Sequence, residues 1–209
     1  LANGLPSFTI VGLPEAEVKE SKDRVRAALQ TAQFEFPARR ITVNLAPADL
    51  PKESGRYDLP IALGILAASG QIPIEALSRY EFAGELALTG ELRSIRGALA
   101  MAFKSYKSGR AFILPRESAA EAALVADAIV YPANTLLEIC AHLAGRTPLA
   151  QQEAHLQSSK LSYPDFSEVK GQSAPKRALE IAAAGGHSVI MSGPPGTGKS
   201  MLASRFAGI

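Results

Sequence analysis

Hydrophobic and polar positions follow two different periods along the chain, and each period predicts a different element. Between residues 15 and 32, apolar positions such as Val25 and Leu29 recur at the spacing of one helix face, with charged residues between them. This spacing predicts an amphipathic helix. Short apolar runs at 7–12 and 41–45 are bounded by polar or turn residues and predict strands on either side of that helix.

The same criteria predict alternating elements up to residue 143. They are a buried helix at 59–68, a hairpin of 82–88 and 92–95 around residues 89–91, helices at 98–106, 118–125 and 136–143, and strands at 111–114 and 128–131. Alternating helices and strands without a tandem repeat predict an α/β domain with mixed strand pairing.

Periodicity is lost between residues 145 and 164, where Pro148 and a polar run take the place of apolar spacing. We therefore predict a first domain at 1–147, a linker at 148–164 and the beginning of a second domain at 165–209.

The second domain opens with a helical pattern at 174–184. This pattern places Leu179, Ile181 and Ala182 on the inward face. A glycine pair ends the helix, and the apolar, β-forming run at 188–192 then predicts a strand.

A phosphate-binding motif follows this strand. Residues 193–200, GPPGTGKS, match the pattern G-x-x-x-x-G-K-[ST] at every position, and a helical pattern at 201–207 comes next. A strand, this loop and a helix form the context of a true P-loop, which disfavours the alternative of a Gly/Pro-rich turn without a ligand. In a P-loop, backbone N–H groups and the lysine contact phosphates, and the hydroxyl binds Mg²⁺. The predicted nucleotide-binding residues are Gly193, Pro194, Pro195, Gly196, Thr197, Gly198, Lys199, Ser200 and Met201, with Ser200 also a ligand of the Mg²⁺ that accompanies ATP.

A P-loop binds a nucleotide, but hydrolysis also needs a metal-holding carboxylate on a later strand and a residue that positions water. Only nine residues follow Ser200. We therefore expect the hydrolytic residues to lie outside this sequence, and the chain to be part of a longer ATPase that is not active alone.

Composition narrows the expected location and partners. The 209 residues are 47% hydrophobic, enough to form real cores, and no apolar run approaches the ~20 residues of a membrane span. We expect a cytoplasmic protein. The 22 basic and 20 acidic residues nearly balance, so nucleic acid must be bound through a local patch. The lone Cys140 lies in an apolar helical run, which predicts a buried, unreactive thiol.

Longer stretches of the chain resemble a known family. The runs SFTIVGLPEAEVKES, NLAPADLPKE, YDLPIALGIL and GELALTGELR, joined to the P-loop sequence, resemble the ComM/YifB family of bacterial magnesium chelatase-like AAA+ proteins over nearly the whole chain. The resemblance implies a Lon-protease-like (ribosomal protein S5 domain 2-like) fold for the first domain. It also implies that the second domain begins a P-loop AAA+ ATPase domain, with ATP and Mg²⁺ as cofactors and a homo-hexamer as the complete assembly.

The resemblance raises the question of peptidase activity. An active Lon domain carries a serine nucleophile at the start of one helix and a lysine base on another. The resemblance places Asp58 and Leu99 at these positions. An aspartate cannot replace the alkoxide nucleophile and a leucine cannot accept a proton, so the domain is expected to be inert toward peptides. Ser54 with Lys52 is the remaining candidate pair.

The function that the resemblance implies is an ATP-dependent DNA helicase, a motor for branch migration in recombination and natural transformation. One alternative is a chelatase motor subunit that inserts magnesium into a porphyrin, which is disfavoured because such motors do not usually carry this first domain. Another is a non-catalytic module that binds nucleotide or DNA. The candidate DNA contacts, for which ordinary solvated faces are the alternative, are Lys19, Lys22, Arg24, Arg26, Arg39, Arg40, Lys52 and Arg56.

Two further expectations concern loops. By resemblance to AAA+ proteins, Val169, Gly171 and Gln172 are candidates for contact with adenine. Loop carboxylates are expected to form ion pairs with Lys52 or Arg56, and these carboxylates are Asp49, Glu53 and Asp58.

Overall fold

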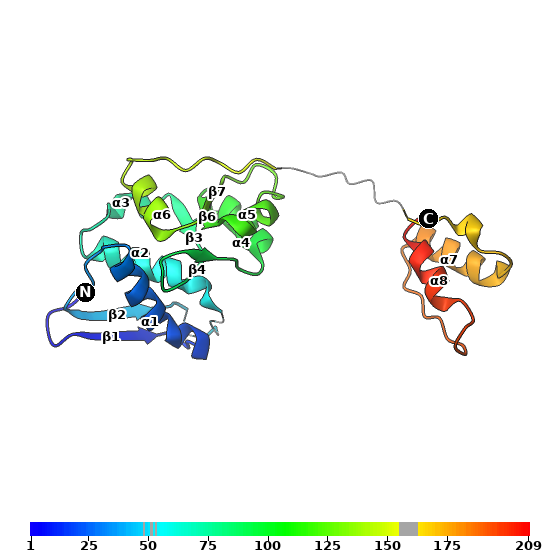
Figure 1. The fold of residues 1–209 in the computed structure, drawn as a ribbon, viewed down its shortest axis with the longest axis horizontal. Coiled ribbons are helices and arrows are strands. Elements are labelled where there is room, and N and C mark those ends of the chain that lie inside the picture. The colour runs from blue at the N-terminus through cyan, green and yellow to red at the C-terminus, as the bar shows by residue number, and fades with distance from the viewer. Residues whose placement is uncertain (48, 51, 53, 155–162) are drawn as a thin grey trace. The chain divides into compact units, whose positions relative to one another are not determined.

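The computed structural model of the chain describes residues 1–47, 49, 50, 52, 54–154 and 163–209. The chain divides between residues 156 and 157 into two compact units (Figure 1). Part of the predicted linker, residues 155–162, lies outside the described residues. The preceding residues contact the first unit, since Gln152 N–H donates to Val130 O at 2.8 Å and Leu149 packs on the core. The boundaries at 147 and 164 remain predictions.

The first layer of the first unit is a parallel strand pair with a crossover helix. Strands β1 (Ser7–Val11) and β2 (Arg40–Asn44) pair from Ser7 opposite Arg40 to Val11 opposite Asn44. Helix α1 (Ala16–Thr31) connects them and packs on α2 (Asp58–Ala68). The strands and helices predicted up to residue 68 are confirmed, with bounds that differ by one residue or less.

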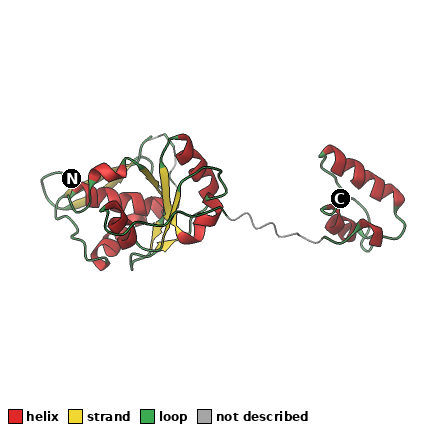
Figure 2. Ribbon diagram, turned by 90° about the horizontal axis from the view of Figure 1, so that it is seen from above, coloured by secondary structure: helices red, strands yellow, loops and turns green. Residues whose placement is uncertain are grey.

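A second parallel sheet follows these elements along the chain. Its strand order is β3 (Tyr80–Phe82), β6 (Ala111–Pro115) and β7 (Val130–Ala133). Figure 2 shows helices flanking the yellow strands of the first unit. The longer helices that follow in this unit, in the predicted order, are α4 (Ala98–Lys107), α5 (Arg116–Ala122) and α6 (Leu136–Leu143).

The predicted hairpin of 82–88 and 92–95 is wrong in its first strand, because that run splits between two sheets. Its start belongs to β3, which pairs with β6, whereas β4 (Glu85–Leu86) pairs antiparallel with β5 (Leu92–Arg93). The break falls at Gly84, whose N–H donates to Arg56 O and whose carbonyl accepts from Leu59 N–H. The backbone of Gly84 thus forms hydrogen bonds with the turn before α2 and with the first turn of α2, and the strand ends there. Periodicity also missed three very short helical segments, α3 (Ile74–Leu77) and the 3₁₀ turns at Gly55–Tyr57 and Phe166–Glu168.

The core of the first unit forms around α2. This helix is buried on most of its surface, as its apolar composition predicts, and Leu59, Leu63 and Leu66 have almost no exposed area. A smaller cluster under α4 and α5 uses alanines such as Ala98 and Ala119 to bring helix and sheet close together. Parallel strands with packed helices make the unit mixed α/β. The finer assignment of a Lon-like fold remains a prediction.

In the second unit, the described residues 163–209 form the helices α7 (Ser173–Gly185) and α8 (Lys199–Phe206), which pack on Val169. Leu179 and Ala182 point inward as predicted, but Ile181 is 52% exposed because it lies on the opposite side of α7. The run 188–192 forms no strand, so that prediction is wrong. A strand needs a neighbour to satisfy its backbone groups, and the described residues of this unit provide none.

No helix in the described parts of the chain is long and apolar enough to span a membrane.

Candidate nucleotide-binding site

The loop between residue 192 and α8 has the backbone that the glycines of the motif predict. Gly196 and Gly198 have φ values of 81° and 82°, in the left-handed region where other residues are strained. Gly198 is the N-cap of α8, so Lys199 and Ser200 occupy its first turn. The unpaired N–H groups of this turn and the helix dipole make it favourable for an anion.

The ammonium group of Lys199 lies inside the loop. Its Nζ donates to Gly193 O at 2.7 Å and to Pro194 O at 2.8 Å. Thr197 Oγ1 braces the same turn by donating to Pro194 O at 3.0 Å. The positive charge is therefore held next to the amino end of α8. Ser200 is exposed in the same turn, with its hydroxyl available to a cation.

A hollow of about 410 Å³ adjoins the loop, a volume within the range of small-molecule sites. Its lining combines apolar side chains of α7 with Lys199 and Thr197. Gln172 closes one side, because its Nε2 donates to Thr197 O at 3.3 Å. Of the three candidates for adenine contact, Gln172 reaches this hollow, whereas Val169 is 1% exposed in the core and cannot contact a ligand. The donors and the space fit a nucleotide phosphate with an attached base.

Asp58, the residue predicted to occupy the position of the Lon nucleophile, lies at the start of α2 and is fully buried. Its Oδ2 accepts from Arg24 Nε at 2.6 Å and from Leu86 N–H at 3.1 Å, and its Oδ1 accepts from Ser21 Oγ and from Arg24 Nη2. The hydrogen bond to Asp58 is the main cause that raises the pKa of Arg24. Asp58 is thus a fully engaged structural carboxylate.

This network corrects the expectation that Asp58 pairs with Lys52 or Arg56. The pairing residue, Arg24, comes from α1. Ser21 lies three residues after Val18 and four before Val25, so helical spacing could have placed this hydroxyl on the buried face of α1. Glu53, another carboxylate of the predicted loop cluster, lies outside the described residues.

Neither candidate peptidase pair is assembled. Leu99 is exposed on α4, where its N–H donates to Glu121 Oε1 at 3.0 Å, and among the described residues it forms no hydrogen bond with Asp58 or the partners of Asp58. The alternative pair is also separated, since Ser54 Oγ accepts from Arg56 Nε at 2.8 Å while Lys52 Nζ donates to Pro47 O. No nucleophile and base meet at these four positions.

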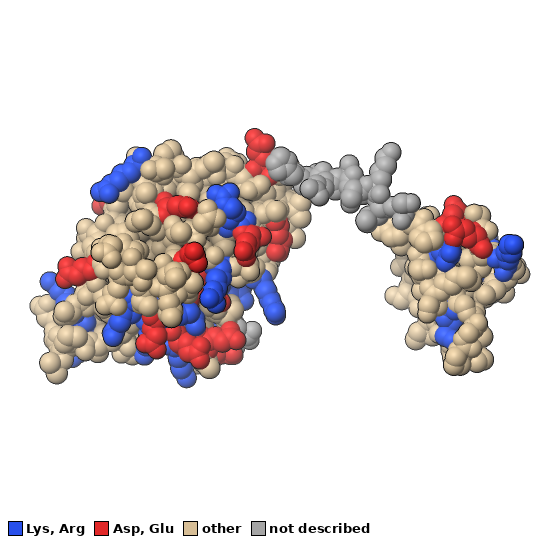
Figure 3. Space-filling model, in the orientation of Figure 1, with Lys and Arg blue, Asp and Glu red and all other residues tan. Residues whose placement is uncertain are grey.

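The basic residues predicted to contact DNA differ in their exposure. Lys52 is only 4% exposed, so its assignment to a DNA-binding surface is wrong. Arg24 is engaged by Asp58, whereas Arg39 and Arg40 are exposed. Figure 3 shows basic and acidic side chains intermixed on the visible face of the first unit. The nearly equal numbers of basic and acidic residues thus correspond to a visible face on which the two charges are interspersed.

Cys140 on α6 is buried, as predicted, and burial raises the pKa of its thiol to about 12. Because the thiolate is the nucleophile, this cysteine is unreactive at neutral pH.

Comparison with known proteins places these features in a family. A family model described as subunit ChlI of Mg-chelatase matches residues 1–118, and a second, described as magnesium chelatase, subunit ChlI, matches residues 165–209 and so includes the P-loop. Over the full chain, the sequence is 53% identical to competence protein ComM of Haemophilus influenzae, 51% to protein YifB of Salmonella typhimurium and 49% to protein YifB of Escherichia coli. The chain spans 41–42% of the length of these relatives. It belongs to the ComM/YifB family of magnesium chelatase-like AAA+ proteins.

Proposed function

We propose that the protein to which this chain belongs is an ATP-dependent motor that acts on DNA and drives branch migration during recombination and natural transformation. The observation that carries the ATP part is the loop that holds the Lys199 ammonium beside the amino end of α8. The DNA part is supported by the name of the Haemophilus influenzae relative, a competence protein.

In this proposal the chain's own residues bind and orient the nucleotide. Backbone N–H groups of Gly193 and of residues 196–198, together with the Lys199 ammonium, hold the phosphates, and Ser200 holds Mg²⁺. Gln172 and the apolar side of α7 border the space for the base. Bound ATP and Mg²⁺ supply the hydrolysis that drives a motor, with the hydrolytic residues contributed by other parts of the protein.

The first unit has a scaffold role in this proposal. Asp58 binds Arg24 and Leu86 instead of acting on a substrate, and Leu99 carries no proton-accepting group. The unit is then free to serve assembly and DNA contact in a cytoplasmic homo-hexamer.

A chelatase motor is the second candidate, favoured by the descriptions of the two matching family models. It shares the ATP site, so nucleotide binding does not distinguish it from a DNA motor. A third candidate, a module that binds nucleotide or DNA without catalysis, is distinguished by the absence of ATP turnover in the complete protein.

The deciding experiment uses the complete protein on a synthetic four-way DNA junction. We expect ATP-dependent strand displacement, which Lys199→Ala abolishes. The matched control is Lys170→Ala, which removes an exposed lysine of the same unit outside the loop. ATP hydrolysis without any strand displacement would overturn the DNA motor and favour a chelatase.

ATP affinity itself provides a separate test of the loop. Charge-assisted contacts are worth about 1.5–3 kcal/mol, so Lys199→Ala should weaken ATP binding about ten- to a hundredfold. Equal ATP affinities of the wild-type protein and Lys199→Ala in calorimetry would contradict the assignment of the P-loop.

A further inference from the structure

Helix α4 presents two aromatic and two basic side chains to solvent. Phe103 and Tyr106 are 51% and 41% exposed, and Lys104 and Lys107 are exposed beside them. We call these four residues the α4 face. Each pair is three residues apart on the helix, so the aromatics form one row and the lysines form the next.

The inward side of α4 explains why the aromatic residues cannot turn away from water. Ala98, Ala102 and Ser105 are buried there, and Ser105 Oγ donates to Arg110 O at 3.0 Å. These small residues hold α4 close to the sheet and leave no room for an aromatic ring. The exposure of Phe103 and Tyr106 is therefore fixed by packing.

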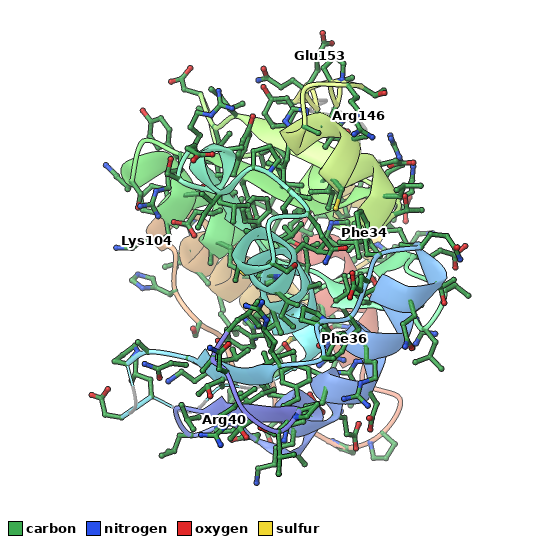
Figure 4. All side chains as sticks on the ribbon, turned by 90° about the vertical axis from the view of Figure 1, so that its left-hand side faces the viewer. Phe34, Phe36, Arg40, Lys104, Arg146 and Glu153 are labelled. Carbon is green, nitrogen blue, oxygen red and sulfur yellow. The ribbon has the colours of Figure 1, made fainter. Side chains whose placement is uncertain are left out.

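The surroundings of the α4 face differ on its two sides. On one side lies an open groove of about 610 Å³. Phe103 and Tyr106 line it together with residues 124–127, which follow α5 and include Asp127. On the other side are the lysines, with Lys107 Nζ 5.5 Å from the centre of the Phe103 ring. Figure 4 shows Lys104 at the edge of the first unit, extending away from the ribbon. Positive charge therefore borders the aromatic row on one side only.

We propose that the α4 face binds single-stranded nucleic acid, with bases stacked on Phe103 and Tyr106 and the phosphate backbone along Lys104 and Lys107. Aromatic side chains stack any base, and adjacent amines bind the backbone without sequence preference. Asp127 on the opposite side repels phosphate, which sets the backbone on the lysine side. A protein helix in the groove is the competing occupant, but it would be bound through apolar side chains and would not require the lysine row.

This inference deepens the DNA part of the proposed function and needs no ATP, so it can be tested separately. The assay is the fluorescence anisotropy of a labelled oligothymidylate of about 20 nucleotides, which exceeds the ~4–16 nucleotides of typical single-strand sites. The 209-residue chain is titrated over a range of salt concentrations. Stacking on one aromatic contributes about 1–3 kcal/mol, so Phe103→Ala should weaken binding about five- to a hundredfold. Phe103→Tyr, which keeps an aromatic face, should preserve affinity.

The lysine row has a charge-matched control in the second unit. Lys170 and Arg177 are exposed basic residues there, and neither is a candidate DNA contact. Replacing Lys104 and Lys107 by Ala should lower the salt slope by about 1.4, because each phosphate contact in single-stranded DNA contributes about 0.7. Replacing Lys170 and Arg177 by Ala should leave the slope unchanged. The chain has no tryptophan, so quenching of tyrosine emission that Tyr106→Phe removes would report stacking directly.

Several outcomes would overturn the inference. Equal losses from the Lys104/Lys107 and the Lys170/Arg177 replacements would indicate nonspecific charge attraction, and unchanged affinity of Phe103→Ala would exclude stacking. If Phe103→Ala instead reduces self-association of the chain while the lysine replacements have no effect, the groove is a protein interface. Each variant is checked by its thermal unfolding midpoint, which exposed positions should not shift. Any of these failures leaves the ATP-dependent motor intact, since that proposal is tested through Lys199.

Discussion

At the scale of single residues, the least expected feature is the buried network around Asp58. A buried charge is tolerated only when it is paired and hydrogen-bonded, and here Ser21, Arg24 and Leu86 engage both carboxylate oxygens. The network joins α1, α2 and β4, which are separated in sequence. It therefore specifies how three elements meet.

Asp58→Asn tests this role. The substitution keeps the shape but removes the charge, which leaves the largely buried Arg24 guanidinium without its counterion. Breaking a buried pair in this way costs about 3–5 kcal/mol, and we expect urea unfolding to report a loss near the lower end because 19% of the Arg24 side chain is exposed.

Glu20 provides the control, since it is 72% exposed and lies 3.6 Å from the same guanidinium. Glu20→Gln should cost under about 1 kcal/mol. Similar losses in the free energy of unfolding for Asp58→Asn and Glu20→Gln would mean that the buried Asp58 contributes no more stability than the exposed Glu20.

His142 gives a pH-dependent prediction. Its Nδ1 accepts from Leu149 N–H at 3.0 Å and its Nε2 lies 3.0 Å from Tyr80 OH, so the neutral ring is the bonded form. Burial, and then the nearby Arg79, lowers the pKa of His142 below its ordinary value of 6.5. Just below pH 6.5, His142 therefore binds a proton more readily in the unfolded chain than in the folded chain. The stability that neutral His142 contributes is complete above pH 6.5 and is lost as the pH falls below it.

Urea unfolding at a series of pH values between neutrality and mild acid checks this expectation. The midpoint should fall on acidification, and His142→Gln should flatten that part of the profile. An unchanged slope in the variant would assign the acid sensitivity to other groups.

At the scale of elements, two neighbouring residues of α2 test different contributions to stability: packing in the core at Leu63 and helix propensity at Gly64. Leu63 is 1% exposed, and truncation to Ala should cost about 2–5 kcal/mol through lost contacts and a cavity. The adjacent Gly64 is exposed, and a Cβ added there would meet nothing within 4 Å. Gly64→Ala should therefore stabilise the protein by about 0.5–1 kcal/mol. Thermal unfolding of the two variants should shift in opposite directions, and destabilisation by Gly64→Ala would show that this face of α2 is covered.

The same scale shows what the sequence could predict. Helices with strong periodicity, such as α1, follow from local spacing, and the P-loop could be found because its residues are contiguous. The split of 82–88 could not be predicted, because β3 finds its partner β6 about thirty residues later. The α4 face was missed for a similar reason, since only packing against the sheet decides that Phe103 points outward.

At the scale of the whole molecule, the main question is how a nearly neutral chain would hold DNA. The exposed Arg39 and Arg40 and the α4 face offer a few contacts per subunit, and Lys52 contributes none because it is buried. Few contacts give weak, salt-sensitive binding. A ring that repeats them multiplies the contacts through effective concentration.

We therefore expect DNA affinity to depend on assembly. The 209-residue chain should bind DNA weakly, whereas the complete protein should bind more tightly when ATP drives assembly, with a steep loss of affinity at high salt. Anisotropy titrations with and without ATP measure this gain, and Lys199→Ala should lack it because its nucleotide site is impaired. Arg39→Glu should weaken DNA binding while sedimentation shows the assembly intact. Tight, salt-insensitive binding by the 209-residue chain alone would contradict both the electrostatic origin of the affinity and its dependence on a ring.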